Sequence, residues 1–482
     1  MKQLTCLADW TLACLGTGML LLLVYLVATH GMATRYVVLA GVALGLFAAR
    51  WLPPIVKLNL VLVVVSTVVA LYVGEIALSL VASARADFAA TQWLTFPSDD
   101  TLESTQERLA ANAKEKPTFD RRNKMQVIQD FERQGIAAYP AVFPHATLRP
   151  VSLDTKHLQA LSVKGIETLP LGGISNVHTV FCNESGEYVT YQSDEHGFHN
   201  PPGIWNLPQF DILAIGDSFT HGACVPSSEN YVGVIREQLS GTVTLGMDSN
   251  GPITMLASLK EYGPQRRPKV VLWFYYEGND LQDMEHEQLS PLLMQYVNRP
   301  FSQGLFDRQP ELDRILREYV SVARQTRGER AGWEDMLKLH HLQKAVAAWY
   351  AGQTREDAER VRLTYWSHEV SPESMKLFRD ILTEADSMVH GWGGQLYFVY
   401  LPQWERYAKP EFANKNRESV LRLINDLKLP FIDLHPAFSQ HPDPVGLFPF
   451  RQSNHYNTAG HRLVGEQVLR VVRGTPLPLR TQ

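Results

Sequence analysis

The stretch that most constrains the fold is Phe210–Gly222, FDILAIGDSFTHG. Residues 210–215 are apolar at nearly every position, which is typical of a strand covered on both faces. Gly216 then allows a sharp backbone turn, and the small polar residues that follow it suit such a turn. Open α/β sheets bind their ligands at the carboxyl ends of parallel strands. The stretch therefore predicts a buried strand that delivers Ser218 to a functional edge.

The composition of the chain divides it into unequal parts. With 482 residues it is long enough for two or three domains, and its net charge of −5 gives no reason to expect a nucleic-acid partner. Apolar runs dominate residues 1–85, and the remainder has an ordinary soluble composition. We expect a membrane anchor over 1–85, a connecting region of helix, loop and short strands over 86–205, and a domain built around the Ser218 strand over 206–482.

Three apolar runs make up the expected anchor. Trp10–Thr29 and Leu58–Val81 each have about the 20 residues that a spanning helix needs. The middle run, between Arg35 and Arg50, has only fourteen residues, roughly 21 Å of helix against a hydrocarbon core of about 30 Å. Snorkelling arginines and a thinned bilayer can accommodate it. We favour three spans, which place the large domain in the periplasm or outside the cell; two spans would leave it in the cytoplasm.

The four cysteines are too few for a disulfide scaffold. Cys182 and Cys224 lie in the soluble part and can pair if that part faces an oxidising compartment. Cys224 is six residues past Ser218, so such a bond would brace the region around the serine. Two separate buried thiols are the alternative.

The GDSFTHG run, residues 216–222, resembles the first block of the SGNH (GDSL) hydrolase superfamily, in which this serine is the nucleophile. It is not the G-x-S-x-G elbow of the α/β-hydrolases, because Thr220 replaces the second glycine. Residues 194–200 resemble a D-x-x-G-F-x-N element of some membrane-anchored members. The resemblance implies an α/β fold, a three-layer α/β/α flavodoxin-like sandwich with a parallel sheet, here preceded by N-terminal transmembrane helices. His196 and His199 in this run lack further ligands nearby, so we expect loop packing and no metal.

Two further blocks supply the oxyanion hole in the family. Thr242–Leu245 reads as a short strand, and the Gly-rich turn after it offers Gly251 as the backbone donor, with Ser249 in that role if the register lies two residues earlier. Lys269–Tyr276 reads as a buried strand that ends in E-G-N-D, which resembles the third block, G-x-N-D. Asn279 would then donate a side-chain amide to the oxyanion.

The last block resembles H-x-N-x-x-G and makes His455 the catalytic base, with His461 as a structural residue on the helix that follows. The family often has D-x-x-H, but Gln452 stands three residues before His455. A glutamine can orient an imidazole but cannot stabilise imidazolium with a charge. Either a Ser–His dyad operates, with Gln452 orienting the ring, or the acid comes from elsewhere. Asp443 and Asp433 are the candidates, and the sequence does not choose between them.

Residues 281–393 form a longer stretch than a simple crossover needs. We expect a helical insertion that caps the site and shapes substrate access. Its predicted helices are Glu311–Gln325, Trp333–Trp349 and one that Pro372 opens after Ser371. The remaining predicted strands are Gln395–Leu401 and Pro430–Leu434.

The resemblance implies acyl transfer through Ser218 without a cofactor. We expect a membrane-anchored serine esterase in the cell (inner) membrane, acting on O-acyl, above all O-acetyl, esters of a carbohydrate or cell-envelope polysaccharide. Its expected partners are the membrane, the acylated carbohydrate and the envelope-polysaccharide machinery. The alternatives are an O-acetyltransferase that works with a partner, a lipid or thioester hydrolase, and a non-catalytic polysaccharide-binding component, which the missing Asp favours.

Overall fold

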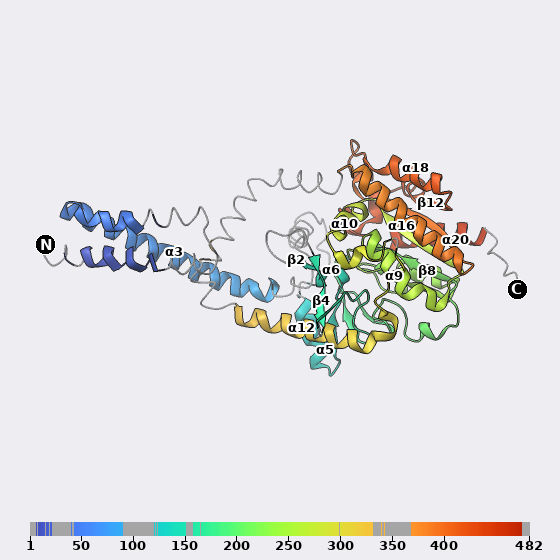
Figure 1. The fold of residues 1–482 in the computed structure, drawn as a ribbon, viewed down its shortest axis with the longest axis horizontal. Helices are drawn as coiled ribbons and strands as arrows, with labels where there is room; N and C mark the ends of the chain where they lie inside the picture. Colours follow the sequence, from blue (N-terminus) through green and yellow to red (C-terminus); the bar gives the residue numbers. More distant parts are fainter. Residues whose placement is uncertain are drawn as a thin grey trace. The chain divides into compact units, whose positions relative to one another are not determined.

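The computed structural model describes residues 120–474 except 121, 123, 151–157, 164, 298, 331–338, 340–341 and 343–367. At the N-terminal end it describes residues 6, 8–14, 16–18, 20–21, 40 and 43–89. The chain divides into two compact units (Figure 1). One unit is Met1–Ala86 with Glu329–Gln353, and the other is Asp87–Gly328 with Thr354–Gln482.

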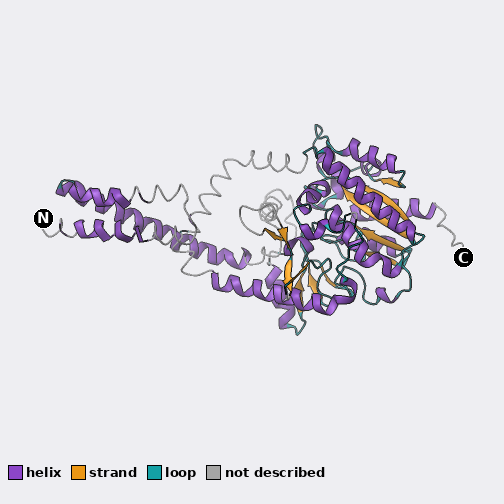
Figure 2. Cartoon of the chain, viewed as in Figure 1, coloured by secondary structure: helices purple, strands orange, loops and turns teal. Residues whose placement is uncertain are grey.

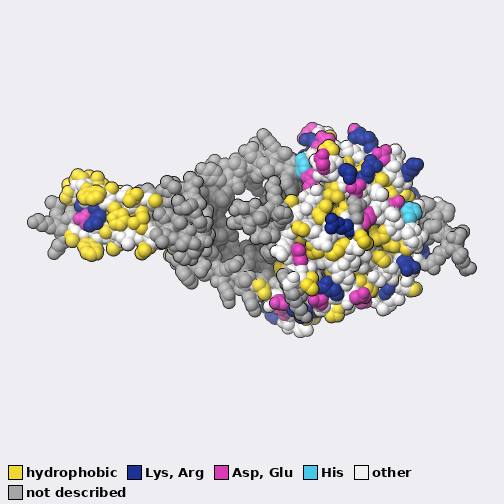
Figure 3. All heavy atoms as spheres, viewed as in Figure 1, with side chains coloured by type: hydrophobic (Ala, Val, Ile, Leu, Met, Phe, Trp, Pro, Cys, Tyr) yellow, Lys and Arg dark blue, Asp and Glu magenta, His cyan; other side chains and the backbone are white. Residues whose placement is uncertain are grey.

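The main element of the first unit is the long helix α3 (Pro54–Ala89), which follows a 3₁₀ turn, η1 (Ala49–Trp51). Its segment Pro54–Ile76 has 23 residues and a mean hydropathy of 2.3, and it is the one described helix long and apolar enough to cross a membrane. Hydrophobic side chains cover much of the described surface of this unit (Figure 3). About half of the residues of the two other predicted spans lie outside the described ranges, so the expected three-span topology stays a prediction.

A five-stranded sheet organises the second unit, with strand order β12-β11-β10-β8-β9. Every neighbouring pair in it is parallel, as predicted. In chain order this is the 2-1-3-4-5 arrangement of flavodoxin-like folds, whose switch point lies between β8 and β10. The strands are β8 (Ile212–Ile215), β9 (Thr242–Thr244), β10 (Val270–Tyr276), β11 (Gln395–Leu401) and β12 (Phe431–Asp433).

Helices cover both faces of this sheet (Figure 2). Because side chains alternate along a strand, Leu213 and Ile215 of β8 join one hydrophobic core while Ile212 and Ala214 join another. The first core contains side chains of α9 (Pro252–Arg266), α16 (Pro372–Gly391) and α18 (Arg417–Leu427). The second contains side chains of α8 (Tyr231–Arg236), α19 (His435–Ser439) and α20 (Thr458–Gly474). The domain is therefore the expected three-layer sandwich.

The predicted helical insertion, residues 281–393, includes a helix that the structure places in the sandwich instead. Helix α16 begins at Pro372 with Ser371 as its N-cap, as predicted, but it packs on β11 and α9 and so belongs to a sandwich layer. The described elements before it are α10 (Asp280–Glu287), α11 (Pro291–Met294), η5 (Leu305–Arg308) and α12 (Gln309–Arg330). The predicted helix 333–349 lies almost wholly outside the described residues.

Helix α12 supports the connecting region, since Asp313 accepts hydrogen bonds from the amide and the hydroxyl of Ser175 at 2.8 and 2.6 Å. That region contains a small sheet, order β1-β6-β7, in which β6 and β7 are antiparallel. Its larger elements are α5 (Lys124–Arg133), β1 (Ala138–Pro140), β6 (His178–Val180) and β7 (Thr190–Gln192). The shorter ones are α6 (Pro144–Thr147), β2 (Arg149–Pro150), β3 (Leu158–Gln159), β4 (Leu161–Val163), β5 (Ile166–Thr168) and η4 (Ile204–Asn206). The region shares one compact unit with the sandwich.

The D-x-x-G-F-x-N run fastens the connecting region to the sandwich. Asp194 accepts hydrogen bonds from the amides of His196 and Phe198 and from the side chain of Asn200, at 2.8 to 2.9 Å. Asn200 in turn accepts from the amide of Thr244 on β9 at 2.9 Å. The run therefore serves as a structural brace beside the strand that carries the serine.

Both histidines of this run are packed in the loop, as predicted. His199 is buried, bonds the carbonyl of His221 through Nδ1 at 2.9 Å, and stacks on Tyr191 with ring centroids 3.8 Å apart. His196 lies edge-on to Trp205 at 4.5 Å. Within the described part of the chain, no group of three or more His, Cys, Asp or Glu is arranged to hold a metal ion.

Candidate active site

Ser218 lies at the carboxyl end of β8, as the first residue of the short helix α7 (Ser218–His221). Gly216 is required before it, because a Cβ there would stand 2.0 Å from the Thr220 hydroxyl oxygen. Asp217 caps the helix by accepting the Phe219 amide at 2.9 Å. As the first helical residue, Ser218 has no intrahelical acceptor for its own N–H.

The structure places His455, the predicted base, beside the serine. Its Nε2 lies 2.7 Å from the Ser218 Oγ. The histidine follows η7 (Pro449–Arg451) and precedes α20. Its loop is fastened to the segment after β11, because the Ser453 hydroxyl donates to Glu405 at 2.8 Å and the Tyr456 hydroxyl donates to the Pro402 carbonyl at 2.6 Å. These two bonds hold the loop in the position from which the imidazole contacts the serine.

The acid that faces His455 is Glu184, a residue that the sequence analysis missed. Its Oε2 lies 2.7 Å from the Nδ1 of His455. Ser218, His455 and Glu184 therefore form one continuous hydrogen-bonded chain. Its nucleophile, base and acid stand in the order of a Ser-His-acid triad.

The three residues suggested for orienting the base do not do so. Both ring nitrogens of His455 are occupied by Ser218 and Glu184, which leaves none for Gln452. Asp443 pairs with Arg451 and accepts the Gly446 amide at 3.2 Å. Asp433 pairs with Arg417 at 2.5 Å. The predictions for Gln452, Asp443 and Asp433 are therefore wrong. Gln452 finds no free ring nitrogen on His455, and each aspartate is paired with an arginine instead.

Glu184 stands in the turn of the hairpin β6–β7, where Val189 donates its amide to the Cys182 carbonyl at 2.8 Å. A disulfide joins Cys182 to Cys224, with Cα atoms 5.2 Å apart. The Ser185 hydroxyl also donates to the Cys224 carbonyl at 2.7 Å. The turn is thus fixed to the segment that follows the nucleophile.

The charge of Glu184 shapes the acid–base behaviour of the site. Burial lowers the pKa of His455, but the charge and hydrogen bond of Glu184, together with the charges of Asp248 and Asp217, outweigh it and raise that pKa to about 9. Burial also raises the pKa of Asp217, to about 7. In the resting site the imidazole therefore favours its protonated form at neutral pH, and raising the pH produces the free base.

Asn279, the predicted side-chain donor, lies at the carboxyl end of β10, the strand that pairs with β8, and it is the N-cap residue of α10. Its Nδ2 donates to Asp283 Oδ2 at 2.7 Å. A side-chain amide has two N–H groups, so one of them stays available for a ligand. Burial, first, and then the charges of Glu287 and other acids raise the pKa of Asp283 well above its usual range.

Gly251 does not fit the oxyanion role that the sequence suggested. Its N–H donates to Glu287 Oε1 at 2.7 Å, and the other carboxylate oxygen of Glu287 accepts the amides of Ile253 and Thr254. Glu287 of α10 therefore occupies the N-terminus of α9. A Cβ at 251 would stand 2.7 Å from that carboxylate, so close packing explains the glycine. Ser249, which has φ +61°, remains the alternative backbone donor.

No protein-family model matches the chain, and no curated protein resembles it. Several solved structures are similar in part, and three of them are named here. A proposed lipolytic protein of the G-D-S-L family from Desulfitobacterium hafniense DCB-2 shares 15% identity at TM-score 0.29, over 54% of this chain and 98% of its own. A lipase/acylhydrolase from Enterococcus faecalis shares 13% sequence identity at a TM-score of 0.30, and the match covers 56% of this chain and 100% of that chain.

The third structure is the acetyl xylan esterase AlAXEase, which shares 13% sequence identity with this chain at a TM-score of 0.30. The match covers 54% of this chain and 98% of the esterase chain. At these scores the likeness adds no weight to a function, which rests on the geometry of this chain's own site.

Proposed function

We propose that this protein is a membrane-anchored serine esterase of the SGNH type. The observation that carries the proposal is the unbroken chain from Ser218 through His455 to Glu184, with both of its hydrogen bonds 2.7 Å long. A nucleophile, a base and an acid in this order are the parts that acyl transfer through serine requires. The apparent lack of an acid was the reason to consider a non-catalytic binding protein. Because Glu184 supplies that acid, this reason no longer holds.

The reaction follows from the roles of these groups. The Ser218 Oγ attacks the ester carbonyl and forms the C–O bond while His455 Nε2 takes the hydroxyl proton. Glu184 stabilises the resulting imidazolium through Nδ1–H. The Ser218 amide and Asn279 donate to the oxyanion. The C–O bond to the alcohol then breaks, and His455 returns the proton to the leaving oxygen. Water, activated by the same histidine, releases the acid and regenerates the serine.

We assign the substrate to the O-acetyl esters of a carbohydrate or an envelope polysaccharide. The long apolar helix segment Pro54–Ile76 supports a membrane anchor, and the disulfide supports an oxidising compartment for the catalytic unit. An enzyme in that position would meet acetylated polymers of the cell envelope. A transferase would use the same acyl-enzyme but would pass the acetyl group to a sugar hydroxyl instead of to water.

The deciding experiment is hydrolysis of p-nitrophenyl acetate by the detergent-solubilised full chain, beside Ser218→Ala and His455→Ala. We expect each variant to lose at least about 10³-fold in kcat, because nucleophile and base act as one unit. Equal turnover by the wild type and Ser218→Ala would overturn the esterase assignment. Acetate release from acetylated polysaccharide, measured with and without an added oligosaccharide acceptor, then separates hydrolysis from transfer.

A further inference from the structure

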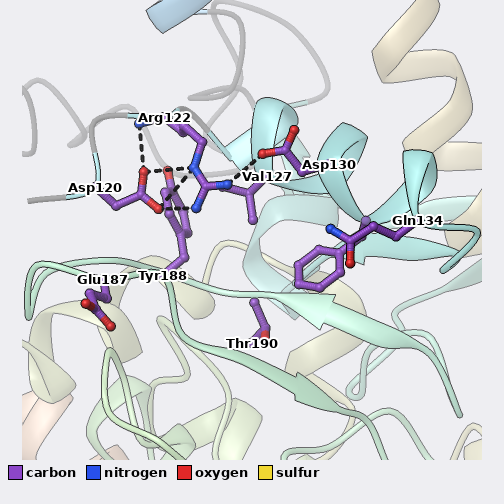
Figure 4. Close-up of a pocket in the computed structure, with 9 residues that line it drawn as sticks. Asp120, Arg122, Val127, Asp130, Gln134, Glu187, Tyr188 and Thr190 are labelled. Carbon is purple, nitrogen blue, oxygen red and sulfur yellow. Dashed lines mark hydrogen bonds and ion pairs between the residues drawn. The ribbon is translucent and has the colours of Figure 1, made fainter.

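A cavity of about 660 Å³ is lined by residues of helix α5 and of the hairpin β6–β7 (Figure 4). None of the three triad residues is among those that line it. Its volume is within the range of about 300–1,000 Å³ that is usual for small-molecule sites. The residues that line it are Asp120, Arg122, Val127, Asp130, Phe131, Gln134, Glu187, Tyr188 and Thr190. The mechanism proposed for Ser218 uses none of them.

The positive charge in this cavity is already neutralised. Arg122 reaches two carboxylates, with its Nε 3.0 Å from Asp120 Oδ1 and its Nη1 2.6 Å from Asp130 Oδ2 (Figure 4). The side-chain hydrogen bond from Arg122 lowers the pKa of both carboxyls, so both are ionised. Glu187 adds a third acid, which is exposed. The lining therefore carries a net negative charge, which disfavours an anionic ligand.

The remaining groups suit a neutral, hydroxyl-rich ligand. Phe131, Tyr188 and Val127 offer apolar surface, and aromatic rings present flat faces to the C–H face of a sugar. Gln134, which is exposed, and Thr190 supply amide and hydroxyl groups, while the carboxylates accept strong hydrogen bonds from hydroxyls. Apolar walls with a few polar groups are the usual design of a specific small-molecule pocket.

One wall of the cavity belongs to the hairpin that carries Glu184. The Asp120 amide donates to the Gly186 carbonyl at 2.7 Å, and the Asn183 side chain donates to the Asp120 carbonyl at 3.0 Å. These bonds attach the cavity wall to the turn that carries Glu184. Glu187, at the rim, is only three residues beyond that acid. The cavity wall is therefore attached to the hairpin that supplies the acid of the triad.

We propose that the cavity is a binding site for neutral sugar units of the glycan whose ester is cut at Ser218. This proposal rests on the function proposed above and names its substrate as an uncharged polysaccharide, bound at a point separate from the scissile ester. The cavity then contributes to the affinity for a polymer and not to the turnover of a small ester.

The test uses the full chain and the double variant Gln134→Ala/Glu187→Ala, which changes only exposed side chains of the rim. Its control is Glu237→Ala/Gln238→Ala, the same residue types in exposed positions outside the cavity. We expect the ratio of kcat/KM on acetylated xylan or acetylated glucomannan to kcat/KM on p-nitrophenyl acetate to fall at least about 5-fold in the rim variant and to stay constant in the control. An unchanged ratio would overturn the proposal.

A binding measurement keeps this test separate from the esterase assignment. Ser218→Ala protein is titrated calorimetrically with xylohexaose, cellohexaose, chitohexaose and hexagalacturonate, with and without the rim substitutions. We expect at least one neutral hexasaccharide to bind and the rim variant to weaken that binding at least about 5-fold. Binding of hexagalacturonate alone, or of none of the four, would overturn the sugar site. Loss of p-nitrophenyl acetate turnover would bear only on the esterase.

Discussion

At the scale of single residues, the contact between Glu184 and His455 sets the pH at which the base can act. Only the neutral imidazole accepts the serine proton, and the neighbouring carboxylate raises the pKa of His455 to about 9. The kcat/KM of the wild type on p-nitrophenyl acetate is therefore expected to rise with pH through an apparent pKa above the usual histidine value of about 6.5.

Removing the charge of Glu184 tests this assignment. In Glu184→Gln the pKa of His455 falls, so the acid limb of the pH profile moves to lower pH. The maximal rate is expected to fall about 10²- to 10⁴-fold, since the imidazolium of the transition state loses its counter-charge. Profiles from pH 5.5 to 10 measure both effects, with the exposed Glu237→Gln as the control. A profile that keeps the wild-type limb would show that Glu184 does not act on the base.

Asn279 is the second residue whose role can be measured. Asn279→Ala removes a donor that is most useful when the oxyanion forms, so kcat is expected to fall about 10²- to 10³-fold while KM changes little. The position of the pH limb should not move, because the charge facing His455 is unchanged. Activity within 2-fold of the wild type would exclude Asn279 from the oxyanion hole. Steady-state kinetics at several pH values provide the measurement.

At the scale of elements, the hairpin β6–β7 depends on its disulfide. The bond closes a loop with a sequence separation of 42, which in the chain-entropy model stabilises the fold by about 4 kcal/mol. Cys182→Ser should lower the melting temperature and also lower kcat, because the turn that carries Glu184 loses its main attachment beside the serine. Thermal unfolding and p-nitrophenyl acetate kinetics check the two effects.

The other cysteines provide the control for this prediction. Cys6 and Cys14 are unpaired and exposed in the first unit, so Cys6→Ser/Cys14→Ser should leave melting temperature and kcat unchanged. Reduction of the wild type should reproduce the Cys182→Ser phenotype. If Cys182→Ser lowers stability but keeps the wild-type pH limb and kcat, the disulfide serves the fold alone and other bonds hold Glu184.

The parts of the fold that the sequence predicts well are those in which one local pattern determines the outcome. Buried parallel strands read as apolar runs, so Gln395–Leu401 was predicted to the residue and the other four strands to within two residues at each end. The helices of residues 281–393 were harder to assign, because an amphipathic pattern does not say what its apolar face covers. That is why α16 was expected in a cap and lies in the sandwich.

The candidate site shows the same limit. Ser218, His455 and Asn279 follow directly from short runs at strand or loop ends, and the structure brings Ser218 and His455 together. Glu184 could not be chosen in that way, since it comes from a separate hairpin and no local spacing links it to His455. The signal that could have found it is the Cys182–Cys224 pair, which places residues 183–185 near the serine. Gly251 failed because Glu287, from another helix, takes its N–H.

At the scale of the whole molecule, the apolar segment Pro54–Ile76 predicts how the protein is held. Val65 lies near its middle and is 44% exposed in the structure. Val65→Arg places a charge there at a cost of about 2.5–3.5 kcal/mol for insertion, so a larger share of the chain should appear in the carbonate-soluble fraction. Val65→Leu is the matched control and should stay in the membrane pellet. Equal fractionation of both variants would remove this segment as the anchor.

The order of the triad along the chain has a consequence for how the protein matures. Glu184, Ser218 and both cysteines of the disulfide are synthesised within 43 residues of one another, as positions 182 to 224, while His455 follows 231 residues after Cys224. Glu184 and Ser218 therefore leave the ribosome well before His455 is synthesised. On the proposed mechanism, a nascent or C-terminally shortened chain can already be oxidised and anchored yet has no hydrolytic activity. On this mechanism, activity cannot begin before the segment that carries His455 is made.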